Sequence, residues 1–516
     1  MADLVTLTID DVAVSVPKGT LVIEAAKQAG VLVPHYCYHP GLPVAGVCRM
    51  CLVEVEKAPK LQIACATQVT DGMVVRTRSA QAKSGRTGVL ELLLINHPLD
   101  CPICDQAGEC ELQDFTFQEG RPSTRYSPTY AKRFNPVEEF GPDVLYVPNR
   151  CILCTRCVRF MEDVAQEPVL NVSERGDRAF IGIHPDAQLD HPWSGNVVDL
   201  CPVGSLLSKD FLHKARAWEL DKTASVCTGC SQGCNVTLDL RDDTVVRIRP
   251  RANLEVNRYF ICDHGRANYR WMNRGDRVEA PLVRDGQALR AVDWDEALDR
   301  VRTLLAGAGG SAVALVSPKA STEALYLARK LLARFNWTGA FQVVMGEEAP
   351  LAGVPNLALR AERAPNGKGA ELLGYSRDYA AAVKAAEKAA VVLVIDDHEA
   401  QFKTSGQVIY LGTMAPDGLL PGANVVLPMA EMVEEDGTYV NRDGRVQRYF
   451  QGRGTPAMAR PAWWVLGQLL DVSPETASAV FDAMAADVDA FRGMSYATLG
   501  LAGQRVGAGA GAGVSA

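Results

Sequence analysis

The chain has 516 residues, which is too long for one ordinary hydrophobic core, so we expect several domains. Its composition is typical of a globular protein. Its net charge of -8 argues against a nucleic-acid-binding protein, because such proteins normally carry a basic face. The sequence contains no run of about 18 apolar residues and no basic, apolar or twin-arginine leader. We therefore expect neither a transmembrane helix nor export from the cytosol.

The placement of the cysteines is the most informative feature of the sequence. All fifteen lie between Cys37 and Cys262. A disulfide framework fits poorly, because the chain is long, has an odd number of cysteines and shows no export signal. Cysteines at C-x2-C spacing in such a chain are more often metal ligands. The sequence therefore predicts metal centres, whose type depends on how the cysteines group.

The first group predicts a 2Fe–2S site. It has the spacing C-x10-C-x2-C-x13-C and comprises Cys37, Cys48, Cys51 and Cys65. The side-chain pattern alternates along residues 5–9 and 12–16, as in the two strands of a β-hairpin. Residues 20–29 have the pattern of a helix ended by Gly30, and a strand should begin within residues 51–55. This order is typical of a ferredoxin-like β-grasp domain whose long loop wraps the cluster, although the spacing differs from the plant-type run. A structural zinc site is the alternative.

The second group places one imidazole beside three thiols and comprises His97, Cys101, Cys104 and Cys110. Residues 86–96 have the pattern of an apolar helix, which His97-Pro98 should end. A histidine just before three clustered cysteines is better explained as the fourth ligand of a 4Fe–4S cluster than as a capping residue. Imidazole in place of thiolate makes a cluster less negative and should raise its reduction potential. The same donors also suit zinc, so that alternative stays open.

The third group is a ferredoxin-type run that lacks its last ligand. Its first three cysteines have C-x2-C-x2-C spacing, but Met161 occupies the position of the fourth. Cys201, which a proline follows, is the free cysteine within reach. Zinc rarely takes three thiolates from so short a run. We therefore expect a second 4Fe–4S cluster on Cys151, Cys154, Cys157 and Cys201.

The fourth group completes the cysteine count and comprises Cys227, Cys230, Cys234 and Cys262. Between its members, residues 236–240 and 244–248 have the pattern of a hairpin with its turn at residues 241–243. We expect a small β-domain wrapped around a third 4Fe–4S cluster. The fifteen cysteines and His97 then form four complete sets of four. Zinc sites would have no need of ferredoxin spacing, so the sets together favour iron–sulfur clusters.

The sequence beyond the last cysteine predicts a different kind of domain. A helix should begin at Trp294, residues 312–316 and 391–395 should be buried strands, and residues 321–334 should form an amphipathic helix between them. Alternating strands and helices predict a doubly wound α/β domain.

No catalytic residue is expected in this chain. The sequence has no G-x-G-x-x-G segment that opens a helix after a strand, and no Walker loop, so it offers no convincing site for NADH or ATP. Asp242-Asp243 and Glu434-Glu435-Asp436 are acidic, but we expect them to be solvated turns rather than acid–base catalysts.

The cluster motifs, taken in chain order, resemble a known family. The likeness is carried by Gly46-Val-Cys48-Arg-Met-Cys51, His97-Pro-Leu-Asp-Cys101, Gly108-Glu-Cys110-Glu-Leu-Gln-Asp114, Arg150-Cys151-Ile-Leu-Cys154 and Asp199-Leu-Cys201-Pro-Val-Gly204. These segments are similar to the large iron–sulfur subunit of NADH:quinone oxidoreductase, respiratory complex I, closely over residues 1–275 and loosely beyond. The resemblance implies one 2Fe–2S and two 4Fe–4S clusters in a relay from the flavin subunit to quinone. The fourth set resembles an extra centre of some bacterial members, which lies off the relay and is expected to be structural.

The later residues resemble the molybdopterin oxidoreductase fold. Gly265-Arg266, Gly437-Thr-Tyr-Val-Asn441 and Gly444-Arg-Val-Gln447 carry this likeness. The stretch is short for that fold, and no cysteine lies beyond Cys262 to bind molybdenum. We therefore expect a truncated domain without molybdopterin, with a serine or aspartate ligand as the open alternative.

These patterns predict a multi-domain chain of α+β and α/β type with six segments. In order, they are a 2Fe–2S ferredoxin-like β-grasp domain (1–80), a 4Fe–4S domain with histidine and cysteine ligands (81–120), a 4Fe–4S ferredoxin-like domain (121–219), a 4Fe–4S domain of the molybdenum- and tungsten-enzyme type (220–276), a degenerate molybdopterin oxidoreductase-like doubly wound domain (277–470), and a C-terminal helix with a disordered Gly/Ala tail (471–516).

The resemblance also implies a function and a setting. It implies an electron-transfer subunit of a bacterial NADH:quinone oxidoreductase, without a complete NADH or quinone site of its own. The implied partners are the flavin-binding NADH dehydrogenase subunit, a two-cluster ferredoxin-like subunit and other peripheral-arm subunits. The implied location is the cytoplasmic side of the inner membrane, with membrane contact only through the complex and no nucleic acid bound. The alternatives are the iron–sulfur subunit of an NAD-linked formate dehydrogenase or hydrogenase complex, and a zinc scaffold.

Overall fold

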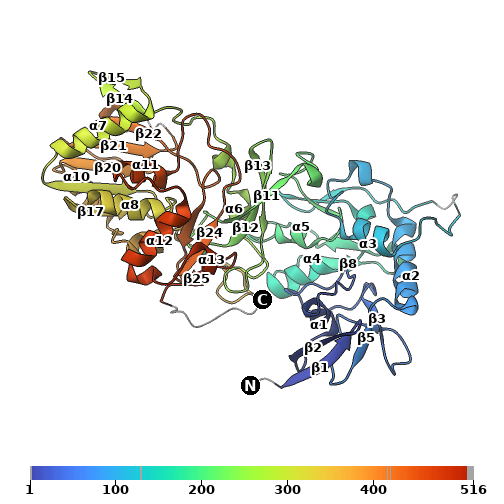
Figure 1. Cartoon of the computed structure of the whole chain (residues 1–516). Coiled ribbons are helices and arrows are strands. Elements are labelled where there is room, and N and C mark those ends of the chain that lie inside the picture. Colours follow the sequence, from blue (N-terminus) through green and yellow to red (C-terminus); the bar gives the residue numbers. More distant parts are fainter. Residues whose placement is uncertain (1–2, 128–130, 415–416, 419, 508–516) are drawn as a thin grey trace. The chain divides into compact units, whose positions relative to one another are not determined.

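The computed structural model describes residues 3–127, 131–414, 417–418 and 420–507. The chain divides into two compact units, which are described separately (Figure 1). The first comprises Met1–Leu220 with Leu351–Pro355, and the second comprises Asp221–Pro350 with Asn356–Ala516.

The first unit begins with a β-hairpin, as the alternating sequence predicts. Strand β1 (Leu4–Ile9) pairs in antiparallel register with β2 (Val12–Pro17). Asp10 and Asp11 form the turn with φ angles of 44° and 69°. Two left-handed residues give the turn the twist that a two-residue hairpin needs, and aspartate tolerates this conformation well.

A five-stranded mixed sheet extends from this hairpin in the order β2-β1-β5-β3-β4. Its other strands are β3 (Leu52–Val55), β4 (Gln62–Ile63) and β5 (Val74–Arg76). Helix α1 (Val22–Gln28) is shorter than predicted, and Gly30 follows it with a φ of 73°. The buried residues of α1 share one core with β1, β3 and β5. The ligand loop between α1 and β3 therefore starts from a rigid base.

Two helices follow the sheet. Helix α2 (Ala80–Asn96) begins six residues earlier than predicted, because the Ser79 side chain caps it by accepting a hydrogen bond from the Ala82 amide. It ends at His97, as Pro98 predicts. Helix α3 (Glu111–Glu119) starts directly after Cys110.

The rest of the first unit consists of short elements around the later cysteines. A three-stranded sheet has the order β10-β7-β6, and β8 and β9 form a hairpin. Helix α4 continues into a π-helical turn over Phe160–Val164. The bounds are β6 (Glu138–Glu139), β7 (Val144–Tyr146), α4 (Arg156–Arg159), β8 (Leu170–Ser173), β9 (Phe180–Ile183), α5 (Asn196–Leu200) and β10 (Leu206–Ser208).

The second unit opens with an antiparallel sheet of three strands, in the order β11-β12-β13. These are β11 (Asp221–Val226), β12 (Asn235–Arg241) and β13 (Thr244–Pro250). The predicted hairpin is the β12–β13 pair, and it turns at exposed Asp242 and Asp243 as expected. Helix α6 (Asp263–Ala267) follows Cys262.

A seven-stranded sheet forms the centre of the second unit, in the order β15-β14-β22-β21-β20-β16-β17. The last five strands are parallel, and the two predicted buried strands, β16 and β20, pair directly. This finding confirms a mixed α/β fold. The bounds are β14 (Leu282–Asp285), β15 (Ala288–Ala291), β16 (Ser311–Val316), β17 (Asn336–Phe341), β20 (Val391–Ile395), β21 (Gln407–Gly412) and β22 (Val425–Pro428).

Helices cover both faces of this sheet (Figure 1). Alternate residues of a strand point to opposite faces. Accordingly, Ala312, Ala314 and Val316 lie in one core with α7 (Trp294–Gly307), α8 (Thr322–Leu332) and α11 (Ala462–Leu469), whereas Val313 and Leu315 lie in another with α10 (Tyr379–Ala386). The predicted helices at Trp294 and after Ser321 are both present.

The remaining elements complete the second unit. Phe481, Met484 and Tyr496 lie in the same core as α8. Residues 508–516 of the expected Gly/Ala tail lie outside the described residues. The bounds are β18 (Ala349–Pro350), β19 (Ala358–Leu359), α9 (Gly367–Leu372), β23 (Gly437–Val440), β24 (Arg445–Tyr449), α12 (Ala477–Asp487), α13 (Tyr496–Leu499) and β25 (Gln504–Arg505).

The expectation of a solvated turn at Glu434-Glu435 is wrong. Both side chains are buried. Arg277 donates to the Glu434 carboxylate at 2.8 and 2.9 Å, and Arg453 donates at 2.9 Å. Tyr449 donates to Glu435 at 3.1 Å. Ion pairs and hydrogen bonds from distant segments thus offset the cost of burying these acids.

Among the described residues, no helix has the length and apolarity to cross a bilayer.

Candidate metal centres

The four cysteines of the first group meet in the loop beside the N-terminal sheet. The thiol of Cys37 is hydrogen bonded to those of Cys48 and Cys65, and Cys51 is hydrogen bonded to Cys65. The amide of Cys37 also donates to Cys48 Sγ at 3.4 Å. In each thiol hydrogen bond, the donor stabilises the thiolate of the acceptor. These bonds therefore hold the pKa of Cys37 below its ordinary value and the pKa of Cys65 above it. The structure therefore brings this whole group together.

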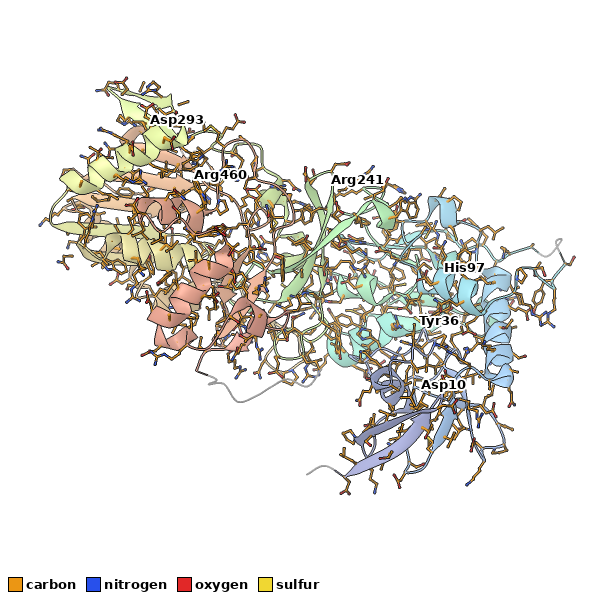
Figure 2. The ribbon with its side chains drawn as sticks, viewed as in Figure 1. Asp10, Tyr36, His97, Arg241, Asp293 and Arg460 are labelled. Atoms are coloured by element: carbon orange, nitrogen blue, oxygen red, sulfur yellow. The ribbon has the colours of Figure 1, made fainter. Side chains whose placement is uncertain are left out.

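Three side chains of the second group line one cavity. His97, at the C-terminal end of α2 (Figure 2), shares a cavity of about 620 Å³ with Cys101 and Cys110. Cys104 does not line this cavity, but it is buried close enough to interact electrostatically with Cys101 and Cys110. A side chain at Gly204 would overlap Cys104 Sγ. Gly204 therefore leaves the space that the Cys104 thiol occupies.

The state of His97 suits a metal ligand. Burial lowers its pKa to about 4, and the positive charges of Lys132 and Arg150 add to the effect. The imidazole is therefore neutral at pH 7 and has a lone pair to offer. Within the described residues, the buried Nδ1 atom of His97 has no hydrogen-bond partner. A buried polar atom without a partner costs free energy, and a bound metal would remove that cost.

All four cysteines of the third group line one small cavity. Cys201 comes from the end of α5, far along the chain from the Cys151–Cys157 loop, yet it faces the same space. The side chains of Tyr146 and Ser205 are hydrogen bonded to Cys151. Burial raises the pKa of each of the four thiols, so thiolates at this site require a positively charged partner such as iron.

The fourth group lies in the second unit, and all four of its thiols are buried. The amide of Cys227 donates to the carbonyl of Cys234 at 2.8 Å, which closes the first loop. A Cβ at Gly265 would lie 3.1 Å from Cys227 Sγ and 3.4 Å from Cys262 Sγ. Both sulfurs therefore lie beside Gly265, although one precedes β12 and the other follows β13.

Backbone amides point at the cysteine sulfurs. Leu153 donates to Cys151 Sγ at 3.4 Å, Gly229 to Cys227 Sγ at 3.4 Å, and Gly265 to Cys262 Sγ at 3.3 Å. Leu153 has a left-handed φ of 54°, which a non-glycine residue seldom adopts. Hydrogen bonds of this kind stabilise negative charge on sulfur and tune the potential of a cluster.

Cysteines from three groups share one apolar core in the first unit. Cys37 and Cys154 are buried in it, and Cys48, Cys110 and Cys201 pack against it. The first three candidate sites are therefore close neighbours. Spacing in the sequence predicts the groups but not their proximity, because proximity depends on how the loops pack.

Sequence reasoning gave no supporting role to several residues around these sites, although Arg150 and Gly204 stand in the motifs that carry the family resemblance. Tyr146 and Ser205 contact Cys151, Gly204 makes room for Cys104, and Arg150 donates to the Asp100 carboxylate and the Gly204 carbonyl. For Tyr146 and Ser205, the only signal is their nearness in sequence to a cysteine. In the part of the chain that the structure describes, no three His, Cys, Asp or Glu side chains are placed to hold a single metal ion.

Domain profiles of known families match most of the chain. In chain order, they are a 2Fe-2S iron-sulfur cluster binding domain (residues 2–80), the NADH-ubiquinone oxidoreductase-G iron-sulfur binding region (86–125), the ferredoxin-like domain of NADH-quinone oxidoreductase subunit 3 (141–207), the molybdopterin oxidoreductase Fe4S4 domain (220–274) and molybdopterin oxidoreductase (277–350 and 368–472). These matches define the class: the chain is an iron–sulfur protein with a molybdopterin oxidoreductase-type domain.

Curated relatives identify the family. The G subunit of NADH-quinone oxidoreductase from Streptomyces coelicolor is 38% identical over 451 residues, which cover 84% of this chain and 53% of the relative. The G subunit from Rickettsia felis is 40% identical over 330 residues, 64% of this chain and 49% of the relative. The mitochondrial NADH-ubiquinone oxidoreductase 78 kDa subunit of Neurospora crassa is 46% identical over 297 residues, 58% of this chain and 40% of the relative. The chain belongs to this family of large iron–sulfur subunits.

The chain spans about half the length of the curated relatives that it matches. Among solved structures, a chain of an NAD+-reducing [NiFe]-hydrogenase in the H2-reduced state is similar, at 30% identity and a TM-score of 0.37. That match covers 41% of this chain and 90% of the hydrogenase chain.

Proposed function

We propose that this chain is an electron-relay subunit of an NADH-quinone oxidoreductase, which passes electrons from the flavin-bearing subunit towards quinone. One observation carries the proposal: cysteines from three ligand groups share a single apolar core. Electrons move efficiently only between neighbouring centres, so a relay requires such proximity. The family membership of the chain supports the same conclusion.

We propose four ligand sets, which hold one 2Fe–2S and three 4Fe–4S clusters. The 2Fe–2S set is Cys37, Cys48, Cys51 and Cys65. The first 4Fe–4S set is His97, Cys101, Cys104 and Cys110. The second is Cys151, Cys154, Cys157 and Cys201. The third is Cys227, Cys230, Cys234 and Cys262.

When bound, such clusters supply one-electron transfer, and the protein sets the conditions for it. Burial of the Cys154 and Cys157 thiols excludes water from the second 4Fe–4S site. The amide of Leu153 offsets negative charge on Cys151. The neutral imidazole of His97 leaves its site less negative than four thiolates would. The amide and the neutral imidazole favour the acceptance of an electron, whereas burial opposes it, so the three features together set the potentials of the clusters.

The fold supports different roles for the two units. We propose that residues 1–80 form a β-grasp domain, residues 81–120 and 121–219 two 4Fe–4S domains, and residues 220–276 a third. Residues 277–470 would then be a truncated molybdopterin oxidoreductase domain without molybdopterin, followed by the C-terminal segment 471–516. The third 4Fe–4S cluster is proposed to stabilise the second unit rather than to carry relay electrons.

The proposed partners are the flavin-binding NADH dehydrogenase subunit, the two-cluster ferredoxin-like subunit and other peripheral-arm subunits. The proposed location is the cytoplasmic side of a bacterial inner membrane, with membrane contact only through the complex. The relatives are themselves subunits of a multi-subunit oxidoreductase, which supports the proposal of partner subunits.

Metal analysis tests the proposal. Anaerobically purified protein should be brown and contain about fourteen iron atoms per chain, because one 2Fe–2S and three 4Fe–4S clusters account for that number. Stoichiometric zinc with little iron would contradict it in favour of a zinc scaffold. Molybdenum or tungsten near one atom per chain would instead favour a molybdoenzyme, such as a formate dehydrogenase.

Replacement of Gly204 by alanine should remove the first 4Fe–4S cluster. The new Cβ would overlap Cys104 Sγ, and a thiolate bound to iron cannot swing away as a free side chain can. We expect the loss of about four iron atoms per chain and of the corresponding electron paramagnetic resonance (EPR) signal, with the 2Fe–2S signal retained.

Gly88→Ala is the matched control for this substitution. Gly88 lies within α2, and a Cβ there would meet no atom within 4 Å. Alanine at this position should keep all iron and raise the stability of the helix by about 1 kcal/mol. Full iron content in Gly204→Ala would show that Cys104 is not held at this place by a cluster.

A further inference from the structure

Two buried arginines of α4 lie between the candidate sites of the first unit. Arg156 and Arg159 are 4% and 9% exposed. Both are separated from Cys157 by no more than one residue in the chain. Long charged side chains are rarely buried so deeply unless their contacts require it. Their partners therefore reveal what they do.

Arg156 joins loops from three ligand sets. Its Nη2 donates to the Tyr38 carbonyl at 2.8 Å, and its Nη1 donates to the Leu200 carbonyl at 3.1 Å. Nη1 and Nη2 also donate to the Glu111 carboxylate at 3.0 and 3.3 Å. Tyr38, Glu111 and Leu200 directly adjoin Cys37, Cys110 and Cys201 in the chain. One guanidinium therefore positions one loop of each set.

Arg159 makes a second set of such contacts. Its Nη2 donates to the carbonyls of Cys37 and Cys154, and its Nη1 donates to the Pro43 carbonyl. Two proposed ligands from different clusters are thus held by one side chain. A guanidinium offers several donors in a rigid fork, whereas a lysine ammonium cannot reach all of these acceptors in fixed directions.

The charge balance around this pair is incomplete. The negative charge of Glu111 offsets the positive charge of Arg156. Within the described residues, Arg159 has no ion pair with a carboxylate. Its hydrogen-bond acceptors are neutral oxygens. Asp163 acts on Arg159 electrostatically without forming an ion pair, and a buried cation with so little counter-charge is unfavourable. Thiolate-ligated clusters on either side of Arg159 would supply the missing negative charge. Conversely, the cation would stabilise the extra electron of a reduced cluster.

We infer that Arg156 and Arg159 form a cationic node that holds the 2Fe–2S loop and the two 4Fe–4S loops in place and raises the reduction potentials of the adjacent clusters. This inference rests on the proposed function, because it requires the proposed ligand sets. The node makes Arg156 and Arg159 positioning residues rather than ligands. It couples three sites through two side chains of one short helix.

Potentiometric EPR on the purified complex tests the node, with Arg159→Gln as the charge-removing variant and Arg159→Lys as the charge-keeping variant. At a fixed potential, Arg159→Gln should lower the reduced-to-oxidised ratio of the 2Fe–2S and second 4Fe–4S clusters about tenfold, which is 59 mV for a one-electron couple. Arg159→Lys should shift both potentials far less, because the charge remains. Arg76→Gln is the control, since Arg76 is exposed and pairs with Glu56 at the surface.

Unchanged potentials in Arg159→Gln, with wild-type iron content, would overturn the inference and leave the proposed function intact. Absence of iron from the wild-type protein would instead overturn the proposed function. If Arg159→Gln loses iron, the node requires that the 2Fe–2S and second 4Fe–4S signals fall together and that the third 4Fe–4S cluster remains. Loss of one signal alone would contradict a shared node.

Discussion

Cys201→Ala should abolish electron transfer from NADH to quinone in the assembled complex, whereas Cys262→Ala should leave turnover near normal in whatever complex assembles. A linear relay fails when any member is missing, and Cys201 is a proposed ligand of a relay cluster. Cys262 belongs to the set proposed to lie off the relay. The measurement is NADH:quinone activity per assembled complex, with assembly quantified separately.

The two variants should also differ in assembly. Cys262 lies in a small β-domain whose four thiols are all buried, so loss of its cluster should weaken folding of the second unit. Metal-binding free energy is also folding free energy for such a domain, and less complex should therefore accumulate. Both substitutions delete the same thiol group, from a buried position at Cys262 and a partly buried one at Cys201, and so serve as controls for each other. Full assembly without turnover in Cys262→Ala would place the fourth set on the electron path.

His97→Ala should remove or distort the first 4Fe–4S signal, with a loss of up to about four iron atoms per chain. The imidazole is neutral because burial lowers its pKa to about 4, and its Nδ1 has no partner among the described residues, so ligation is the role its surroundings favour. EPR spectra and iron content of the purified complex measure the effect. His97→Cys should keep the cluster at a lower potential, because a thiolate adds negative charge.

His184→Ala is the control for the His97 variants. His184 follows β9 in the same unit, is exposed, and is held through its backbone amide. Its replacement should leave every cluster signal unchanged. Unchanged signals in His97→Ala as well would show that the first 4Fe–4S set is wrong.

Several elements could be predicted because their signals are local. The β1–β2 hairpin follows from alternating residues around Asp10-Asp11, and the β12–β13 hairpin follows from the same logic around Asp242-Asp243. The end of α2 follows from Pro98. Its start was missed because residues 80–85 are small and polar, so hydrophobic periodicity gives no signal there, and only the Ser79 cap marks it.

The sequence by itself determined the four cysteine groups. The C-x2-C spacing is a property of the chain alone, and so is the division of fifteen cysteines and His97 into four complete sets of four. Only the tertiary structure decided that three of these groups share a core. The tertiary structure alone also decided that Glu434 is buried against Arg277. The same is true of the hydrogen bonds that Arg159 donates to the carbonyls of Cys37 and Cys154. Such contacts join segments far apart in the chain. Spacing constrains neighbours along the backbone, whereas burial and charge pairing depend on which loops pack together.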